Sequence, residues 1–237
     1  MFDGVHIGHR QLVETARSLA DRHGDSVTVY TFSNHPMQLL RGSVSLLSDN
    51  KERERLLLEA GADSVYMEPF DEEMCTMQPE VFLERLNRLF AVKGIVCGFN
   101  YTFGHFGAGK PEMLLAYGKE HNVPVEVVSH FDALGAPVSS TRVRNMLVSG
   151  DTESALRLLG HPFYLAGSVV GENTDGGFIL AFDKSLTVPF PGSYSAVENG
   201  SGIRGAIREH NGVWAFYPET GSVLSGTVSF SVTGRIR

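Results

Sequence analysis

The feature that most constrains the fold is a change in residue patterning near Gly160. Before it, strand-like runs alternate with segments whose apolar residues recur at helical spacing. After it, short β-type runs are separated by glycine-rich turns, without a convincing helical pattern. The patterning predicts an α/β domain over residues 1–160, with a parallel sheet covered by helices, followed by a small antiparallel β-barrel over residues 161–237.

The expected elements can be given as residue ranges. In the first part we expect strands at 27–32, 64–67, 94–97 and 123–128, and helices at 11–23, 49–60, 79–90, 111–121, 141–148 and 151–159. Asp49 and Glu52 form a capping-box pattern, and Pro79 suits a first helical turn. In the second part we expect strands at 164–170, 178–182, 194–198, 213–217 and 223–232.

Composition narrows the class of protein. The chain has 237 residues, 42% of them hydrophobic, which is enough for a substantial core. Its net charge of −7 argues against a nucleic-acid or membrane-surface binder. Cys75 and Cys97 fit neither a metal spacing nor a disulfide framework, and neither a membrane span nor a signal peptide before Phe2 is apparent. We expect a cytoplasmic protein whose oligomeric state the sequence leaves open.

Two histidines and two glycines open the chain in a pattern typical of phosphate binding. His6 and His9 lie three residues apart, so they face the same way across one helical turn. Gly4 and Gly8 let backbone N–H groups approach a phosphate at the positive N-terminal end of a helix. The turn is therefore expected to hold a nucleotide triphosphate.

Two further segments follow predicted strands, where ligands bind in open α/β sheets. Residues 31–36 read Thr-Phe-Ser-Asn-His-Pro and gather hydroxyl, amide and imidazole groups. Residues 98–109 interleave aromatic residues with glycines, which suits a planar ring held beside a phosphate. We expect both segments to contribute to a ligand site.

A fourth segment, Ser139–Arg144, opens a predicted helix. Ser140 and Thr141 are expected to cap that helix. Arg144 can reach an anion at the same end, where it would neutralise the charge on a departing pyrophosphate.

Together these four segments resemble the adenylyltransferase module of the prokaryotic bifunctional riboflavin kinase/FAD synthetase family, within the HxGH nucleotidyltransferase superfamily. The resemblance covers residues 2 to about 160 and rests on four motifs in order: Phe-Asp-Gly-Val-His-x-Gly-His, Thr-Phe-x-x-His-Pro, Gly-Phe-Asn-Tyr-x-Phe-Gly and Ser-Ser-Thr-x-Val-Arg. It implies a Rossmann-like nucleotidyltransferase domain.

The resemblance also implies a reaction and its site. The expected enzyme is an FMN adenylyltransferase (FAD synthetase) that transfers AMP from ATP to FMN, giving FAD and pyrophosphate. By this resemblance the catalytic residues are His6, His9, Asn100 and Arg144. The implied ATP site comprises Phe2, Asp3, Gly4, His6, Gly8, His9, Ser140, Thr141 and Arg144. The implied FMN site comprises Thr31, His35, Pro36, Phe99, Asn100, Tyr101, Phe103 and Phe106. Mg²⁺ is expected to be carried by the ATP phosphates, without protein ligands.

The second part matches this family less well. Relatives carry a riboflavin kinase barrel with a Pro-Thr-Ala-Asn stretch that serves Mg-ATP, whereas this chain reads Phe-Ile-Leu-Ala-Phe-Asp at 178–183. We therefore expect a shortened barrel without kinase activity. The alternatives are a bifunctional kinase/synthetase, a different HxGH nucleotidyltransferase acting on a phosphopantetheine or sugar-alcohol phosphate, and a flavin- or nucleotide-binding regulator without turnover.

The histidine turn of relatives follows a central strand, and only Met1 precedes Phe2 here. We expect a gap in the sheet at that position, with unpaired backbone groups on the flanking strands.

Overall fold

The chain forms two compact units, described from a computed structural model that covers residues 1–42 and 44–236. The first unit comprises Met1–Val44 and Glu54–Asp132, and the second comprises Ser45–Arg53 and Ala133–Arg237. The domain boundary near Gly160 stays a prediction. Within the described residues, no helix is both long and apolar enough to cross a membrane.

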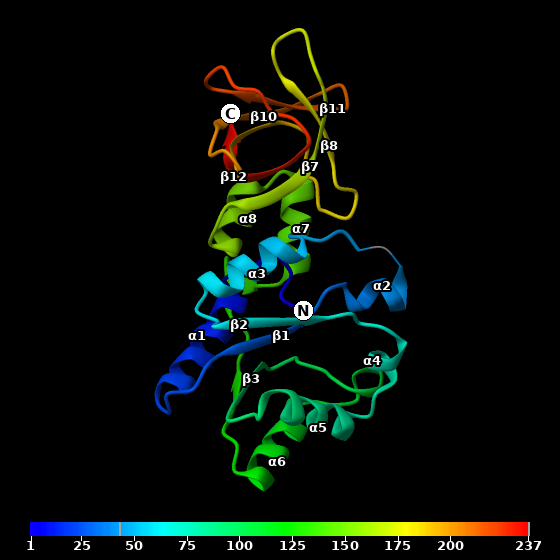
Figure 1. Ribbon diagram of the computed structural model, residues 1–237, viewed down its shortest axis with the longest axis vertical. Helices are drawn as coiled ribbons and strands as arrows, with labels where there is room; N and C mark the ends of the chain where they lie inside the picture. The colour runs from blue at the N-terminus through cyan, green and yellow to red at the C-terminus, as the bar shows by residue number, and fades with distance from the viewer. Residues whose placement is uncertain (43, 237) are drawn as a thin grey trace. The chain divides into compact units, whose positions relative to one another are not determined.

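The first unit alternates helices and short strands (Figure 1). Its elements, in chain order, are η1 (Asp3–Val5), α1 (Ile7–Asp21), β1 (Thr28–Phe32), α2 (Pro36–Arg41), β2 (Ser64–Glu68), α4 (Glu72–Thr76), α5 (Pro79–Phe90), β3 (Ile95–Gly98), η2 (His105–Gly107), α6 (Pro111–His121) and β4 (Val125–Val128). Helix α3 (Asn50–Glu59) and strand β5 (Asp132–Ala133) span two of the three points at which the chain passes between units; the third lies between Val44 and Ser45.

The strands of the first unit are parallel, as predicted, but they form two pairs. β1 pairs with β2, and β3 pairs with β4, in separate two-stranded sheets. Among the described residues no ladder joins β1 to β3. Within the described residues, the backbone N–H and C=O groups on the free side of β1 and of β3 therefore take part in no strand pairing.

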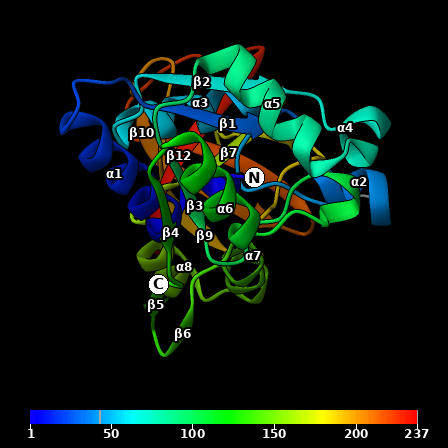
Figure 2. The same cartoon turned by 90° about the horizontal axis from the view of Figure 1, so that it is seen from below.

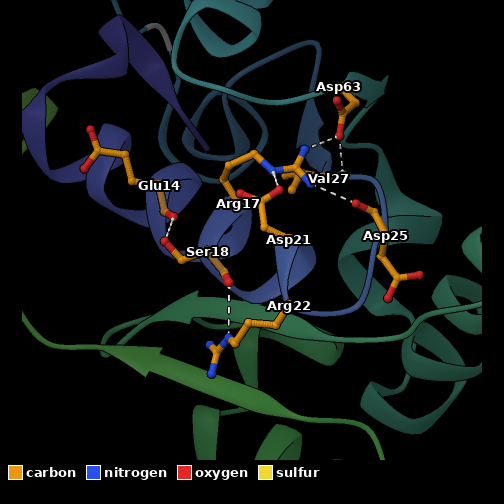
Figure 3. Close-up of polar contacts among 8 residues, drawn as sticks. All are labelled: Glu14, Arg17, Ser18, Asp21, Arg22, Asp25, Val27 and Asp63. Carbon is orange, nitrogen blue, oxygen red and sulfur yellow. Dashed lines mark hydrogen bonds and ion pairs between the residues drawn. The ribbon is translucent and has the colours of Figure 1, made fainter.

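Helix α1 is fixed at its C-terminal half by Arg17 (Figure 3). The guanidinium contacts Asp63 at 2.6 Å and Asp21 at 2.8 Å and donates to the carbonyl oxygen of Asp25 at 2.8 Å. Asp63 also accepts from the Val27 N–H at 2.7 Å, and these bonds hold the pKa of its carboxyl below the usual value, the Val27 bond most strongly. The network ties α1 to the start of β1 and so fixes the axis along which the His6–His9 turn is presented.

The second unit contains a closed six-stranded antiparallel barrel in the order β10-β11-β8-β7-β12-β9. Its elements are β6 (Ala136–Pro137), α7 (Ser140–Ser149), α8 (Thr152–Leu159), β7 (Phe163–Glu172), β8 (Phe178–Phe182), β9 (Ser193–Glu198), β10 (Arg204–His210), β11 (Val213–Pro218) and β12 (Thr227–Ile236). Alternate residues face inward, as Val228, Phe230 and Val232 do along β12. Closure leaves no free sheet edge, and the predicted α/β domain followed by a barrel is confirmed.

Most helix boundaries follow from local chemistry. Asp49 accepts from the Glu52 N–H at 2.7 Å, as the capping pattern predicts, and Pro79 opens α5. Helix α6 has the predicted bounds, Pro111–His121. The sequence interpretation missed β10, α2, α4 and the β5–β6 hairpin, which is labelled in Figure 2.

Candidate active site

The His6–His9 turn is a helix start built by its own histidines. His6 is the N-cap of α1, and its Nδ1 accepts from the His9 N–H at 3.3 Å. The two rings stack with their centroids 3.6 Å apart and their planes 12° apart. His6 is 5% exposed. The predicted pairing of the imidazoles on one side of the turn is therefore what the structure shows.

Burial sets the charge of His9. Desolvation lowers its pKa well below the usual value, and His6 and the N-terminal amino group lower it further. Its Nδ1 is buried and has no hydrogen-bond partner among the described residues. The ring of Phe2 packs at 5.0 Å from that of His9. His9 is therefore neutral near pH 7 and keeps a buried ring nitrogen available for a ligand.

The residues before the turn adopt an unusual backbone. Gly4 has φ +71° and Val5 has φ +36°, a value that β-branched residues rarely adopt. Asp3 and Val5 are both buried. Such strain is maintained only where the surrounding structure over-determines it, and it clusters at functional sites.

Gly8 places no side chain on the first turn of α1, between His6 and Phe131. A Cβ added there would lie 3.4 Å from the His6 ring and 3.8 Å from Cβ of Phe131. The His9 and Arg10 N–H groups already donate to the His6 carbonyl, at 2.8 and 3.0 Å, so an anion at this helix start would be bound by the N–H groups that precede them. Phe131 was missed by the sequence interpretation, although its place after β4 follows the rule that ligands bind at strand carboxyl ends.

The segment after β1 divides into structural and candidate binding groups. Asn34 exchanges two hydrogen bonds with the backbone of Phe70, at 2.9 and 2.7 Å, and so fixes the loop. His35 Nδ1 accepts from the Met37 N–H at 3.1 Å, and Pro36 opens α2. Thr31 is buried, and its Oγ1 has no hydrogen-bond partner within the described part of the chain. Of this predicted set, Thr31 offers an unused polar group.

The aromatic loop after β3 also separates into two kinds of residue. Phe99 is 50% exposed and Phe106 is 66% exposed, whereas Phe103 is 5% exposed and lies in a hydrophobic cluster. Tyr101 stacks on Phe103 with centroids 5.7 Å apart, and burial raises the pKa of its hydroxyl. Asn100 is exposed. Only Phe99 and Phe106 therefore present open aromatic faces.

Gly104 shapes this loop. Its φ is +67°, and a Cβ there would lie 2.7 Å from the backbone of Pro79. Only glycine satisfies both conditions. The close approach fixes the loop against the start of α5.

The predicted cap of α7 is corrected by the structure. The N-cap is Ser139, whose Oγ accepts from the Arg142 N–H at 3.3 Å, rather than Ser140 or Thr141. Ser140 and Thr141 instead occupy the first turn, because the helix begins one residue earlier than predicted. Arg144 donates to Thr141 Oγ1 at 3.4 Å.

The structure brings some of the predicted site residues into contact with one another. The rings of Phe2 and His6 each contact that of His9 at the start of α1, and Tyr101 and Phe103 are stacked in the loop after β3. Ser140, Thr141 and Arg144 belong to the second unit, where they lie on the first two turns of α7. Their assignment to ATP or FMN stays a prediction.

Comparison with known proteins identifies the family. The sequence profile described as FAD synthetase matches residues 1–142. A bifunctional riboflavin kinase/FMN adenylyltransferase of Listeria monocytogenes is 30% identical over 172 residues, which cover 71% of this chain and 54% of that protein. A protein of the same organism named FAD synthetase is 28% identical over 205 residues, covering 85% of this chain and 79% of its own length.

A solved structure covers the whole chain. The crystal structure described as a macrolide-efflux protein from Streptococcus pneumoniae superposes with a TM-score of 0.87 at 25% identity, covering 100% of this chain and 83% of that one. The chain spans about half the length of the bifunctional Listeria relative. Because the family profile covers 142 of its 237 residues, this protein belongs to the FAD synthetase family.

Proposed function

We propose that this protein is an FMN adenylyltransferase. A phosphate oxygen of FMN forms a bond to the α-phosphorus of ATP, the bond from that phosphorus to the bridging oxygen of the β-phosphate breaks, and FAD and pyrophosphate result. The observation that carries the proposal is the stacked, capped His6–His9 pair at the start of α1. The names of the matched relatives supply the flavin substrate.

The start of α1 is assigned to the ATP phosphates. Its positive helix end favours an anion, and Gly8 places no side chain there. His9, held neutral by burial, can donate or accept a hydrogen bond without a change of charge. Catalysis then consists of positioning and charge stabilisation, without a covalent intermediate.

The leaving group is assigned to α7. In the proposal, Ser140, Thr141 and Arg144 bind the pyrophosphate, as the resemblance implies. Arg144 bonds to Thr141 in the structure, so its guanidinium already lies over the first turn. A guanidinium at a helix start is well suited to a phosphate.

Flavin is assigned to the loop after β3. Phe99 and Phe106 expose aromatic faces, and Thr31 Oγ1 offers a buried hydroxyl. Asn100 is proposed to lie near the reacting phosphates, and His35 and Pro36 to border the ligand. Phe103 and Tyr101 support the loop from within its core.

Mg²⁺ fits as part of the substrate. We expect it to arrive bound to ATP, because Mg²⁺ usually keeps several waters and binds through substrate phosphates. When bound, the ion neutralises charge on the triphosphate.

In this proposal the protein works in the cytoplasm on small molecules, which agrees with its two free cysteine thiols.

Kinase activity is proposed to be absent. The segment that stands where relatives carry Pro-Thr-Ala-Asn is β8, and its Phe178 and Leu180 are buried in the barrel core. Those positions offer no polar group to a nucleotide.

The substrate assignment is tested with a panel of acceptors. FMN, phosphopantetheine and a sugar-alcohol phosphate are each mixed with MgATP and the protein, and pyrophosphate release is measured. We expect release with FMN alone, accompanied by the loss of flavin fluorescence. Release with another acceptor and none with FMN would favour the rival nucleotidyltransferase.

A further inference from the structure

Helix α7 is built into the core of the second unit along one face. Val143 and Leu147 are fully buried in the hydrophobic cluster that also contains Phe163 and Phe230 of the barrel. In Figure 1, α7 and α8 lie directly beneath the barrel. The hydrophobic core of the barrel therefore includes the face of α7 that carries Val143 and Leu147.

The C-terminal end of α7 is also held by the barrel. The Phe190 N–H donates to the Leu147 carbonyl at 2.8 Å, and Arg235 Nη1 donates to the Gly150 carbonyl at 3.3 Å. Carbonyl groups at a helix end lack partners within the helix. The loop before β9 and strand β12 thus bond to this helix end, in addition to the Gly150 N–H, which donates to the Leu147 carbonyl at 3.2 Å.

The first turn of α7 is held by Arg142. Its Nη1 donates to the carbonyl oxygens of Ala133 and Ala136 at 2.7 Å each and to that of Pro137 at 3.3 Å, and its Nη2 donates to that of Leu134 at 2.9 Å. One guanidinium thus gathers the β5–β6 hairpin against the helix. The planar donor fork of arginine can do this, whereas a lysine ammonium has three donors at a single point.

From this arrangement we propose that Arg142 is a positioning residue and that the barrel serves as the support of α7. Arg142 fixes the hairpin and the first turn, the barrel fixes the buried face and the far end, and Ser140, Thr141 and Arg144 are thereby presented in one geometry. The inference rests on the proposed function for the ligand of those three residues. It gives the barrel a role in adenylyl transfer without kinase chemistry.

The test compares Arg142→Ala and Arg142→Lys with Arg157→Ala. Arg157 lies on α8 and forms an exposed ion pair with Glu153 at 2.6 Å, so its removal makes the same change of charge. The hairpin carbonyls freed in Arg142→Ala lie at an exposed hairpin, where water can replace the guanidinium, so the fold is retained. Thermal unfolding checks this for each variant.

Three measurements are made on the full chain: amide hydrogen exchange of residues 139–145, calorimetric binding of inorganic pyrophosphate, and the KM values for MgATP and FMN. In Arg142→Ala we expect faster exchange, weaker pyrophosphate binding and a KM for MgATP raised about tenfold, because a misplacement of ~1 Å can cost up to about 100-fold. The KM for FMN is expected to stay unchanged, Arg142→Lys to recover part of the loss, and Arg157→Ala to match the unaltered protein.

The inference is overturned if Arg142→Ala exchanges these amides and binds pyrophosphate as the unaltered protein does. It is also overturned if Arg157→Ala produces the same changes. Failure of the proposed function would be seen separately, as absence of FAD formation by the unaltered protein. The exchange measurement decides the role of Arg142 even in that case.

Discussion

At the scale of single residues, His6 joins the fold to the proposed chemistry. Its Nδ1 accepts the His9 N–H, so in the neutral ring the proton is carried by Nε2. A helix cap therefore sets the tautomer of the neutral ring. The same bond orders the first turn of α1, where the proposed phosphate binds.

His9 predicts a pH dependence of stability. Its pKa is lowered in the folded state, mainly by desolvation, from an ordinary value of 6.5. As the pH falls below about 6.5, the unfolded chain takes up a proton that the folded protein resists, so the free energy of unfolding falls, by at most ~1.4 kcal/mol per pH unit for one group. Urea denaturation at about pH 7.5 and about pH 5.5 measures the loss.

Removing the imidazole isolates this contribution. His9→Gln should show a smaller decrease in stability between the two pH values, whereas His23→Gln, at an exposed position, should behave as the unaltered protein. An unchanged pH dependence in His9→Gln would show that His9 is not held neutral by the fold.

A substitution at Gly8 is expected to affect the proposed phosphate binding without weakening the fold. An added Cβ would make only ordinary contacts, and alanine is favoured over glycine in a helix by up to ~1 kcal/mol. Gly8→Ala should therefore keep or raise the melting temperature. It should raise the KM for MgATP about tenfold, since a hydrogen bond to a charged group contributes ~1.5 kcal/mol or more.

A matched control is Gly171→Ala in β7, where the added Cβ would meet only Ile179 Cδ1 at 3.8 Å. It should leave the KM unchanged. An unaltered KM in Gly8→Ala would place the triphosphate elsewhere.

At the scale of elements, local signals predicted what local chemistry decides. Pro111 and the left-handed Asn122 enclose α6, and Asp49 caps α3. Strand β10 was missed because its residues Arg-Gly-Ala-Ile-Arg-Glu-His give little apolar alternation, and only Gly205 and Ile207 are buried. Its strand state comes from pairing with β9 and β11, which no local window records.

Long-range contacts also account for what was missed at the candidate site. Arg142 finds its four carbonyl partners only once the hairpin has formed, and Phe131 reaches Gly8 only through the fold. Leu47, in the segment before α3, joins the barrel core of the second unit, and Leu46 bridges to Leu186. The four motifs predict the candidate site residues, whereas Arg142 and Phe131 became visible only in the structure.

The cap of α7 gives a prediction at this scale. Ser139→Ala removes the acceptor for the Arg142 N–H and should lower the free energy of unfolding by ~1 kcal/mol. Thr141→Ala, on the exposed side of the first turn, should change it by less than ~0.5 kcal/mol. Urea denaturation measures both, and a larger loss in Thr141→Ala would contradict the assignment of the cap.

At the scale of the whole molecule, the barrel is proposed to support adenylyl transfer without phosphorylating riboflavin. The buried Phe178 and Leu180 of β8 leave no polar group where relatives carry theirs. Riboflavin with MgATP should therefore yield no FMN by chromatography. Rapid formation of FMN would restore the bifunctional alternative.

The most direct test of the central claim is to quantify the FAD and pyrophosphate that the purified 237-residue chain forms from FMN and MgATP, beside His9→Ala. We expect equal amounts of the two products from the unaltered protein. His9→Ala should retain FMN binding and lose about 100-fold or more of the rate, as removal of a positioned transition-state donor typically does. Binding of both substrates without formation of either product would contradict the claim and favour a flavin- or nucleotide-binding regulator.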